Sequence, residues 1–256
     1  MRIFILSVKL DLRVYVIWLW FCRICKTIVG LKVNWRMFKG HCFSKEVILH
    51  AVYCKLRFSL SYRDVEELSS IRGVKVDHAT IQRWVYKFTP LLEAVFKKRK
   101  KAVGNSWRMD ETYIKIKGVW RYLYRAVDKH GNTIDFLLTK RRNKRAAHLF
   151  LLKAIHNNCT PDIINIDKSG ANKQAIRTYN KRTLSKIKIR QCKYLNNSIE
   201  ADHRFVKWRT QHMLGFKNFE SASRTLTGIE IIRMIKKEQV TIPMATSYAT
   251  FCSLAA

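Results

Sequence analysis

The order of strand-like and helix-like segments between residues 107 and 213 constrains the fold of this chain more than any other feature. Apolar, β-branched runs separated by turns predict a three-stranded antiparallel meander at 107–116, 120–127 and 133–138. Helical and strand-like periodicity then alternates, which predicts helices at 143–155, 171–179 and 197–213 and strands at 163–166 and 187–192. This order predicts an α/β fold with a mixed five-stranded sheet and flanking helices.

Three acidic residues occupy distinctive places in this pattern. Asp110 lies on the first strand, Asp167 directly follows the fourth, and Glu200 lies on the helix after the fifth. Two strand-borne aspartates and a helix-borne glutamate are what a ribonuclease-H-like core uses to hold two cations over a phosphodiester, about 3.5–4 Å apart. Magnesium prefers such oxygen ligands. We therefore predict that these three residues are catalytic and bind two Mg²⁺ ions, with Mn²⁺ as an alternative.

Other acids compete for these roles. Glu111 is the chief rival of Asp110, but adjacent residues of a strand point to opposite faces of the sheet. Asp128 and Asp135 are expected at turn or exposed strand positions. A single aspartate at a strand end is more often a cap than a ligand, so the prediction depends on the ordered set of three.

The helix predicted at 197–213 also carries cations near Glu200. His203, Arg204 and Lys207 follow that residue by three, four and seven positions. They therefore share its side of the helix, whereas Asp202 points roughly the opposite way. A cation one or two turns from a metal-binding acid can hold a neighbouring phosphate, which predicts DNA contacts for Lys207 and His203. For His203 and Arg204, an ordinary charged helix surface is the alternative.

Before the strands, residues 44–88 read as three short helices. Ser61-Tyr-Arg-Asp64 is a capping-box pattern, Gly73 marks a turn, and Asp77 can cap a third helix running to about Phe88. Gln82 and Arg83 face away from the apolar stripe of that third helix. This layout is typical of a helix-turn-helix with its recognition helix last, although helical bundles without a DNA role share it.

The charge of the chain selects the class of partner. Fifty Lys and Arg residues stand against 18 Asp and Glu, a formal net charge of +32. Such a surface attracts polyanions, nucleic acid above all. The basic run at 97–101 followed by Gly104 reads as a linker. We expect a helix-turn-helix DNA-binding domain at 37–96, a basic linker at 97–105, a catalytic domain at 106–239 and a C-terminal tail at 240–256.

Residues 1–36 differ in character from the rest of the chain. The apolar run Val14–Cys22 is bracketed by charges and is shorter than the roughly 20 residues that span a bilayer, so no membrane association is expected. Met37 directly precedes the segment where amphipathic patterns begin. The hypothesis is that residues 1–36 are an upstream, non-functional extension of the reading frame.

Several long runs of sequence resemble the transposases of bacterial insertion sequences of family six. The resemblance extends from Met37 to about Gln239 and is carried by segments that include SYRDVEELSSIRGVKVDHATIQRWV, WRMDETYIKIKGVWRYLYRAVDKHGNTIDFLL, INIDKSGAN and NNSIEADHRFVKWR. It implies a helix-turn-helix that recognises terminal inverted repeats, an Asp-Asp-Glu catalytic domain and replicative movement through cointegrates. It also implies metal ligands at Asp110, Asp167 and Glu200 and the family's basic residue at Lys207.

The resulting hypothesis is a transposase that acts on double-stranded DNA, both the element's inverted repeats and the target. A homodimer or higher oligomer is expected because two ends must meet, and a cytoplasmic, nucleoid-associated location is expected in a bacterium. The segment between Asp167 and Glu200 is slightly shorter than in close relatives, and residues 1–36 have no counterpart. The alternative functions are therefore an inactive remnant that only binds DNA and a nuclease that cuts without joining.

Overall fold

The centre of the molecule is a five-stranded mixed sheet. The computed structural model describes residues 37–168, 170–192, 194–211, 213 and 215–255, so the hypothesis about residues 1–36 lies outside the described residues. The strands lie in the order β3-β2-β1-β4-β5, with β1–β2 and β2–β3 antiparallel and β1–β4 and β4–β5 parallel. Their bounds are Ser106–Ile116 for β1, Val119–Asp128 for β2, Thr133–Thr139 for β3, Ile163–Ile166 for β4 and Lys188–Gln191 for β5.

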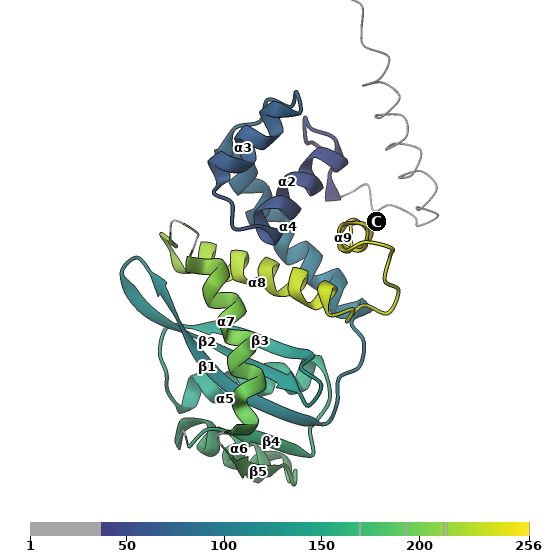
Figure 1. Ribbon diagram of the computed structural model, residues 1–256. Coiled ribbons are helices and arrows are strands. Elements are labelled where there is room, and N and C mark those ends of the chain that lie inside the picture. Colours follow the sequence, from purple (N-terminus) through teal and green to yellow (C-terminus); the bar gives the residue numbers. More distant parts are fainter. Residues whose placement is uncertain (1–36, 169, 193, 212, 214, 256) are drawn as a thin grey trace, which may run out of the picture.

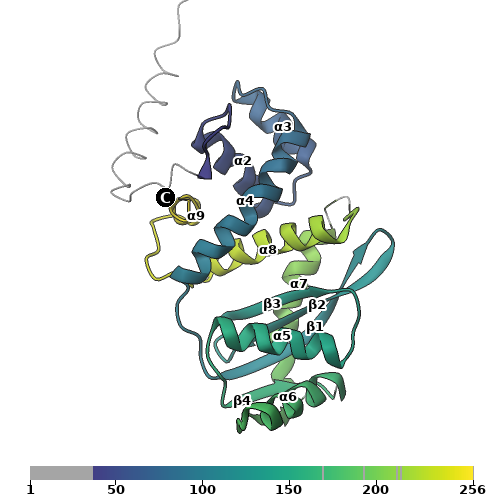
Figure 2. The ribbon, with the colours of Figure 1, turned by 180° about the vertical axis from the view of Figure 1, so that it is seen from behind.

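Helices cover both faces of this sheet. Helices α5 (Lys144–Asn157) and α6 (Gly170–Thr183) pack on one face, and α7 (Asn197–Gln211) crosses the other (Figures 1 and 2). The alternating burial along β1 follows from this, because Trp107 and Met109 join the core under α5 and α6 while Ile114 and Ile116 join the core on the other face. The predicted α/β fold with a mixed five-stranded sheet and flanking helices is confirmed.

In the described part of the chain, three helices precede the sheet, each begun by a side-chain cap. Helix α2 (Lys45–Arg57) is capped by Ser44, α3 (Tyr62–Ile71) by Ser61 and α4 (His78–Arg99) by Asp77. The predicted capping box is confirmed, since the Asp64 backbone N–H donates to Ser61 Oγ and the Ser61 N–H donates to Asp64 Oδ2. Gly73 has a φ of +74° in the turn between α3 and α4, where a side chain would be strained.

Helix α4 runs well past the predicted end at Phe88. It continues through Pro90 to Arg99, so the first three residues of the expected linker are helical. Proline lacks the N–H that would bond the carbonyl of Tyr86 four residues earlier. Arg224 of helix α8 (Phe219–Lys236) donates to that carbonyl instead, at 2.6 Å from Nη1 to O. A tertiary contact therefore satisfies the group that proline leaves unpaired, and the helix continues.

Helix α8 joins the N-terminal helices to the sheet. It packs against α4 and α2 on one side, and its residues share a single apolar core with Ile114, Leu123 and Leu138 of the sheet. At Gly228 the approach to α2 is so close that an added Cβ would lie 2.4 Å from Leu56 Cδ2. The N-terminal helices are thus packed directly on α8, which shares its apolar core with the sheet.

The last residues fold back onto this helical layer. The expected tail contains α9 (Ser247–Ser253), which packs on α2 and α8 and buries Phe251 and Leu254. Among the described residues, the helices are all too short or too polar to cross a membrane.

Candidate active site

Asp110 and Asp167 stand opposite each other on neighbouring strands. Strands β1 and β4 are parallel, with Arg108 paired to Asn165. Continuing that register by two residues places Asp110 opposite Asp167, the residue that follows the last position of β4. Both side chains point to the face that α7 covers, because adjacent residues of a strand alternate between faces. Two aspartates that are 57 positions apart in sequence thus lie side by side at the edge of the sheet where strand β4 ends.

Glu200 approaches the same edge from α7. It lies in the first turn of that helix, is exposed, and faces out of the core that Ile199 and Val206 join. Asp167 and Glu200 are both close enough to Asp110 to raise its pKa. Burial raises it first, followed by the negative charges of Glu111, Asp167 and Glu200, and it reaches about 7. Asp110 is therefore a buried carboxyl within a cluster of acids.

This cluster suits divalent cations. Carboxylates that raise one another's pKa are destabilised in the charged form, and a bound cation removes the repulsion. The three ligand oxygens do not converge on one point. Within the described part of the chain, only Glu66, Asp77 and His78 bring three ligand atoms within 4.8 Å of one another. The ligand oxygens of Asp110, Asp167 and Glu200 are spaced more widely than this.

The Glu66, Asp77 and His78 group has a structural explanation. Glu66 accepts a hydrogen bond from the backbone N–H of His78, at 3.2 Å, and Asp77 caps the first turn of α4. His78 Nδ1 lies 2.9 Å from Glu66 and 3.0 Å from Asp77 on a half-exposed surface. The group holds the start of α4 against α3.

His203 lies beneath Asp110 and not on the surface of α7. Its side chain is buried, and Nδ1 lies 3.6 Å from Asp110 Oδ2. Burial first, then the positive charges of Arg125 and Lys207, lowers the pKa of His203 to about 3. The ring is therefore neutral near pH 7 and buried, so it offers DNA phosphate neither a positive charge nor an exposed donor. This position departs from the predicted DNA contact because Asp202 and His203 both turn toward the sheet.

A buried ion network fixes α7 on the sheet. Arg125 of β2, opposite Asp110 in the register, donates to Asp202 of α7 at 2.6 Å and to Glu230 of α8 at 2.7 Å. Arg233 and Lys237 also bind Asp202, the latter at 2.9 Å. Although burial raises the pKa of Asp202, these three cations hold it well below its usual range. Asp202 is two residues from Glu200, so the network sets where Glu200 stands.

Glu111 points to the other face of the sheet, as expected for the neighbour of Asp110. Its carboxylate is buried, pairs with Arg142 and accepts a hydrogen bond from Asn172 Nδ2 at 3.0 Å. Arg142 also reaches Asp167, with 4.0 Å between Nη2 and Oδ2. Glu111 is thus occupied by two partners, and Arg142 links it to the active-site edge.

The remaining predicted residues are exposed. Lys207 lies on the solvent side of α7, as does Arg204, and Gln82 and Arg83 lie on the solvent side of α4. Sequence reasoning missed Arg125 and Arg142, which position the site. The strand periodicity did place Arg125 within β2, but no local pattern shows that its partners come from residues 202 and 230.

Comparison with known proteins assigns the family. The sequence model of a family described as "DDE domain" matches residues 104–239, and one described as "Transposase IS66 family" matches residues 40–162. The transposase for the insertion sequence-like element IS431mec of Staphylococcus aureus is 40% identical over 201 residues, which are 77% of this chain and 87% of that protein. The chain belongs to the DDE transposases of insertion sequences. The Staphylococcus aureus transposase of IS257 in transposon Tn4003 matches this DDE transposase equally well.

Solved structures show a more distant likeness to this DDE transposase. The HTLV-2 integrase catalytic core domain in complex with magnesium is 16% identical, with a TM-score of 0.41 over 61% of this chain and 100% of that one. The simian T-cell lymphotropic virus intasome structure is 18% identical, with a TM-score of 0.37 over 60% of this chain. The match covers 49% of that intasome chain, about half of its length.

Proposed function

We propose that this transposase cuts the ends of its insertion sequence and joins them to target DNA, using Asp110, Asp167 and Glu200 as metal ligands. The observation that supports this most is the placement of Asp110 opposite Asp167, with its pKa raised to about 7 by burial and neighbouring acids. Two Mg²⁺ or Mn²⁺ ions bound there would activate the attacking oxygen and stabilise the leaving oxygen. No covalent enzyme intermediate is needed.

The residues around the three acids position them or bind a neighbouring phosphate. His203, neutral and buried, packs beneath the Asp110 carboxyl, with 3.6 Å between Nδ1 and Oδ2. Lys207 is exposed seven residues after Glu200 on the same side of α7, about 10 Å along the helix axis. It is placed to bind a phosphate next to the one that reacts. Arg142 steadies Asp167 from the side of Glu111.

The N-terminal helices are proposed to bind the terminal inverted repeats. Helices α3 and α4 form the helix-turn-helix, and α4 presents exposed Gln82 and Arg83 near its start. Arginine pairs with guanine and glutamine with adenine in the major groove. Two ends must be brought together for replicative transposition through a cointegrate, so the active complex contains at least two copies of the chain.

A strand-transfer assay tests this function. The full chain is mixed with labelled duplex that carries the inverted repeats flanking its gene and with an unlabelled target, in Mg²⁺ or in EDTA. Joined products in Mg²⁺ and none in EDTA are expected. Binding of the repeats without cutting would contradict the proposal and leave a DNA-binding remnant. Cut but unjoined strands would leave a nuclease.

A further inference from the structure

The segment between the second and third proposed metal ligands has an unusual charge. The 32 residues from Lys168 to Ile199 contain nine Lys and Arg and no Asp or Glu. The rest of the chain has 41 basic residues (50 minus 9) against all 18 acids. The segment thus has no acid of its own that could neutralise its cations, although Asp167 and Glu200 bound it on both sides.

Its cations are available to a ligand. Within the segment, Lys173 is half-buried and the other described basic side chains are exposed. None of them forms a side-chain hydrogen bond or ion pair with another described residue. They are Lys168, Lys173, Arg177, Lys181, Arg182, Lys186, Lys188 and Arg190. Cations that serve a structural purpose in this molecule, such as Arg125 and Arg142, are paired.

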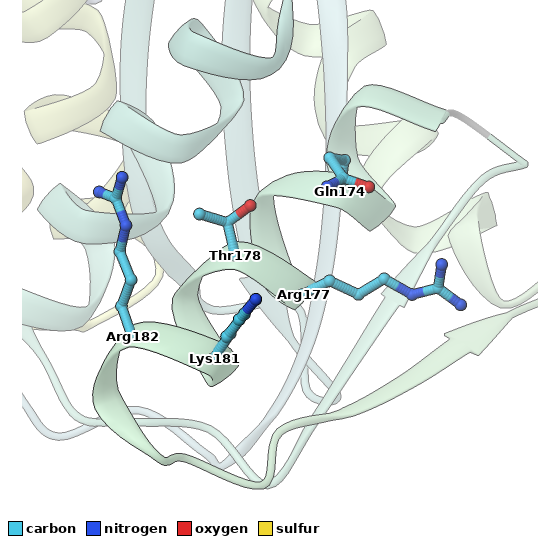
Figure 3. Close-up of a pocket in the computed structure, with 5 residues that line it drawn as sticks. All are labelled: Gln174, Arg177, Thr178, Lys181 and Arg182. Atoms are coloured by element: carbon cyan, nitrogen blue, oxygen red, sulfur yellow. The ribbon is translucent and has the colours of Figure 1, made fainter.

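Helix α6 arranges these cations in rows. Lys173, Arg177 and Lys181 are four residues apart and therefore lie along one side of the helix, with Arg182 beside them. Arg177, Lys181 and Arg182 line a shallow pocket together with Gln174 and Thr178 (Figure 3). Like charges four residues apart oppose helix formation. The free protein gains nothing from this row, whereas a bound polyanion would remove the repulsion.

We propose that this basic surface, formed by α6 and β5, binds the phosphate backbone of the target duplex. The inference rests on the proposed function and adds to it a second DNA site, separate from α4. Lysine and arginine side chains offer donors and no acceptors, which suits binding to the acceptor oxygens of phosphate. A target of unfixed sequence has to be held in this way.

The position and size of the surface fit this role. Helix α6 begins at Gly170, three residues after Asp167, so its start is within about 11 Å of the active-site edge. The helix has 14 residues and is therefore about 21 Å long, the length of about six base pairs. In Figures 1 and 2, α6 lies below the sheet and the N-terminal helices α2, α3 and α4 lie above it, so the two proposed DNA sites are on different parts of the molecule.

Salt-dependent binding tests the proposal. Two triple variants of the full chain are compared, Arg177→Gln/Lys181→Gln/Arg182→Gln on α6 and Lys98→Gln/Lys101→Gln/Lys129→Gln as the control. The control removes the same charge from exposed side chains outside the segment. Affinity for a fluorescent duplex without inverted repeats is measured from 50 to 200 mM salt. The slope of log K against log salt is expected to become less negative by about 3 in the α6 variant, one per lost phosphate contact, and by less than about 1 in the control.

One further variant and one further substrate complete the test. Arg177→Lys/Arg182→Lys keeps the charge and is expected to keep the wild-type slope, which separates lost contacts from a disturbed fold. Affinity for a duplex carrying the inverted repeat is expected to stay within about twofold of that of the control variant. Equal slopes for the α6 and control variants would overturn the proposal, as would an equal loss for repeat and non-repeat duplexes. Failure of the proposed function would appear separately, as absence of joined products with the wild-type chain.

Discussion

Arg125 of β2 and Asp202 of α7 form a buried ion pair, with 2.6 Å between Nη2 and Oδ2. Arg125 is the cross-strand partner of Asp110, and Asp202 is two residues from Glu200. One pair therefore connects β2, the neighbour of the strand that carries Asp110, with α7, the helix that carries Glu200. Through Glu230, the same arginine is bound to α8, on which the N-terminal helices pack.

Removing one member of this pair should destabilise the fold strongly. In Asp202→Asn, Arg125, Arg233 and Lys237 lose the negative charge that they surround in a buried site. We expect the free energy of unfolding, measured by urea titration, to fall by about 3–5 kcal/mol. Glu220→Gln removes an exposed partner of Arg224 and should leave the free energy of unfolding almost unchanged. Similar losses for both variants would contradict a stabilising network.

The contact between α8 and α2 should not tolerate a side chain at Gly228. A Cβ there would lie 2.4 Å and 2.5 Å from the two terminal carbons of Leu56, which is itself fully buried. Gly228→Ala should therefore lower the free energy of unfolding by about 1–3 kcal/mol. In a Leu56→Ala background the same substitution should cost little, because the clashing atoms are gone. A cost that is unchanged in that background would show that overpacking is not its cause.

Lys100 should give the fold a measurable pH dependence. Burial lowers its pKa to about 8, against the opposing charges of Asp135 and Asp128. The folded state therefore disfavours the charged lysine below pH 8, and this penalty fades as the pH rises from 8 to about 10.4, the pKa in the unfolded chain. Relative to Lys100→Met, the wild-type chain should gain up to about 1.4 kcal/mol of stability per pH unit in that window. A difference between the two proteins that is flat over this window, or falls with pH, would contradict the assignment.

The strands, the helices and the positions of the acids on them could be predicted because each depends only on residues that are close together in the sequence. Apolar, β-branched runs predicted all five strands, and Asp110 and Asp167 could be placed on or directly after them without knowledge of the sheet order. Their meeting depends on β1 and β4 being neighbours, which the observed strand order supplies.

Other features depend on partners distant in sequence. The continuation of α4 through Pro90 requires Arg224, which is 138 residues from the carbonyl that it binds. The inward turn of His203 follows from Asp202 binding Arg125 and Lys237, 77 and 35 residues away. Residues 240–255 have no strong pattern, and α9 forms because α2 and α8 offer it an apolar surface. Local periodicity carries no information about such contacts.

Whether Asp110 is a metal ligand is tested by comparing Asp110→Asn with Glu111→Gln. Both variants remove one of two adjacent carboxylates, but only Asp110 faces Asp167 and α7. The measurement is Mg²⁺-dependent joining of inverted-repeat duplex to target, alongside binding of the same duplex. We predict that Asp110→Asn abolishes joining and leaves binding intact, while Glu111→Gln still joins at temperatures where it is folded. Joining by Asp110→Asn, or loss of binding together with joining, would contradict the account.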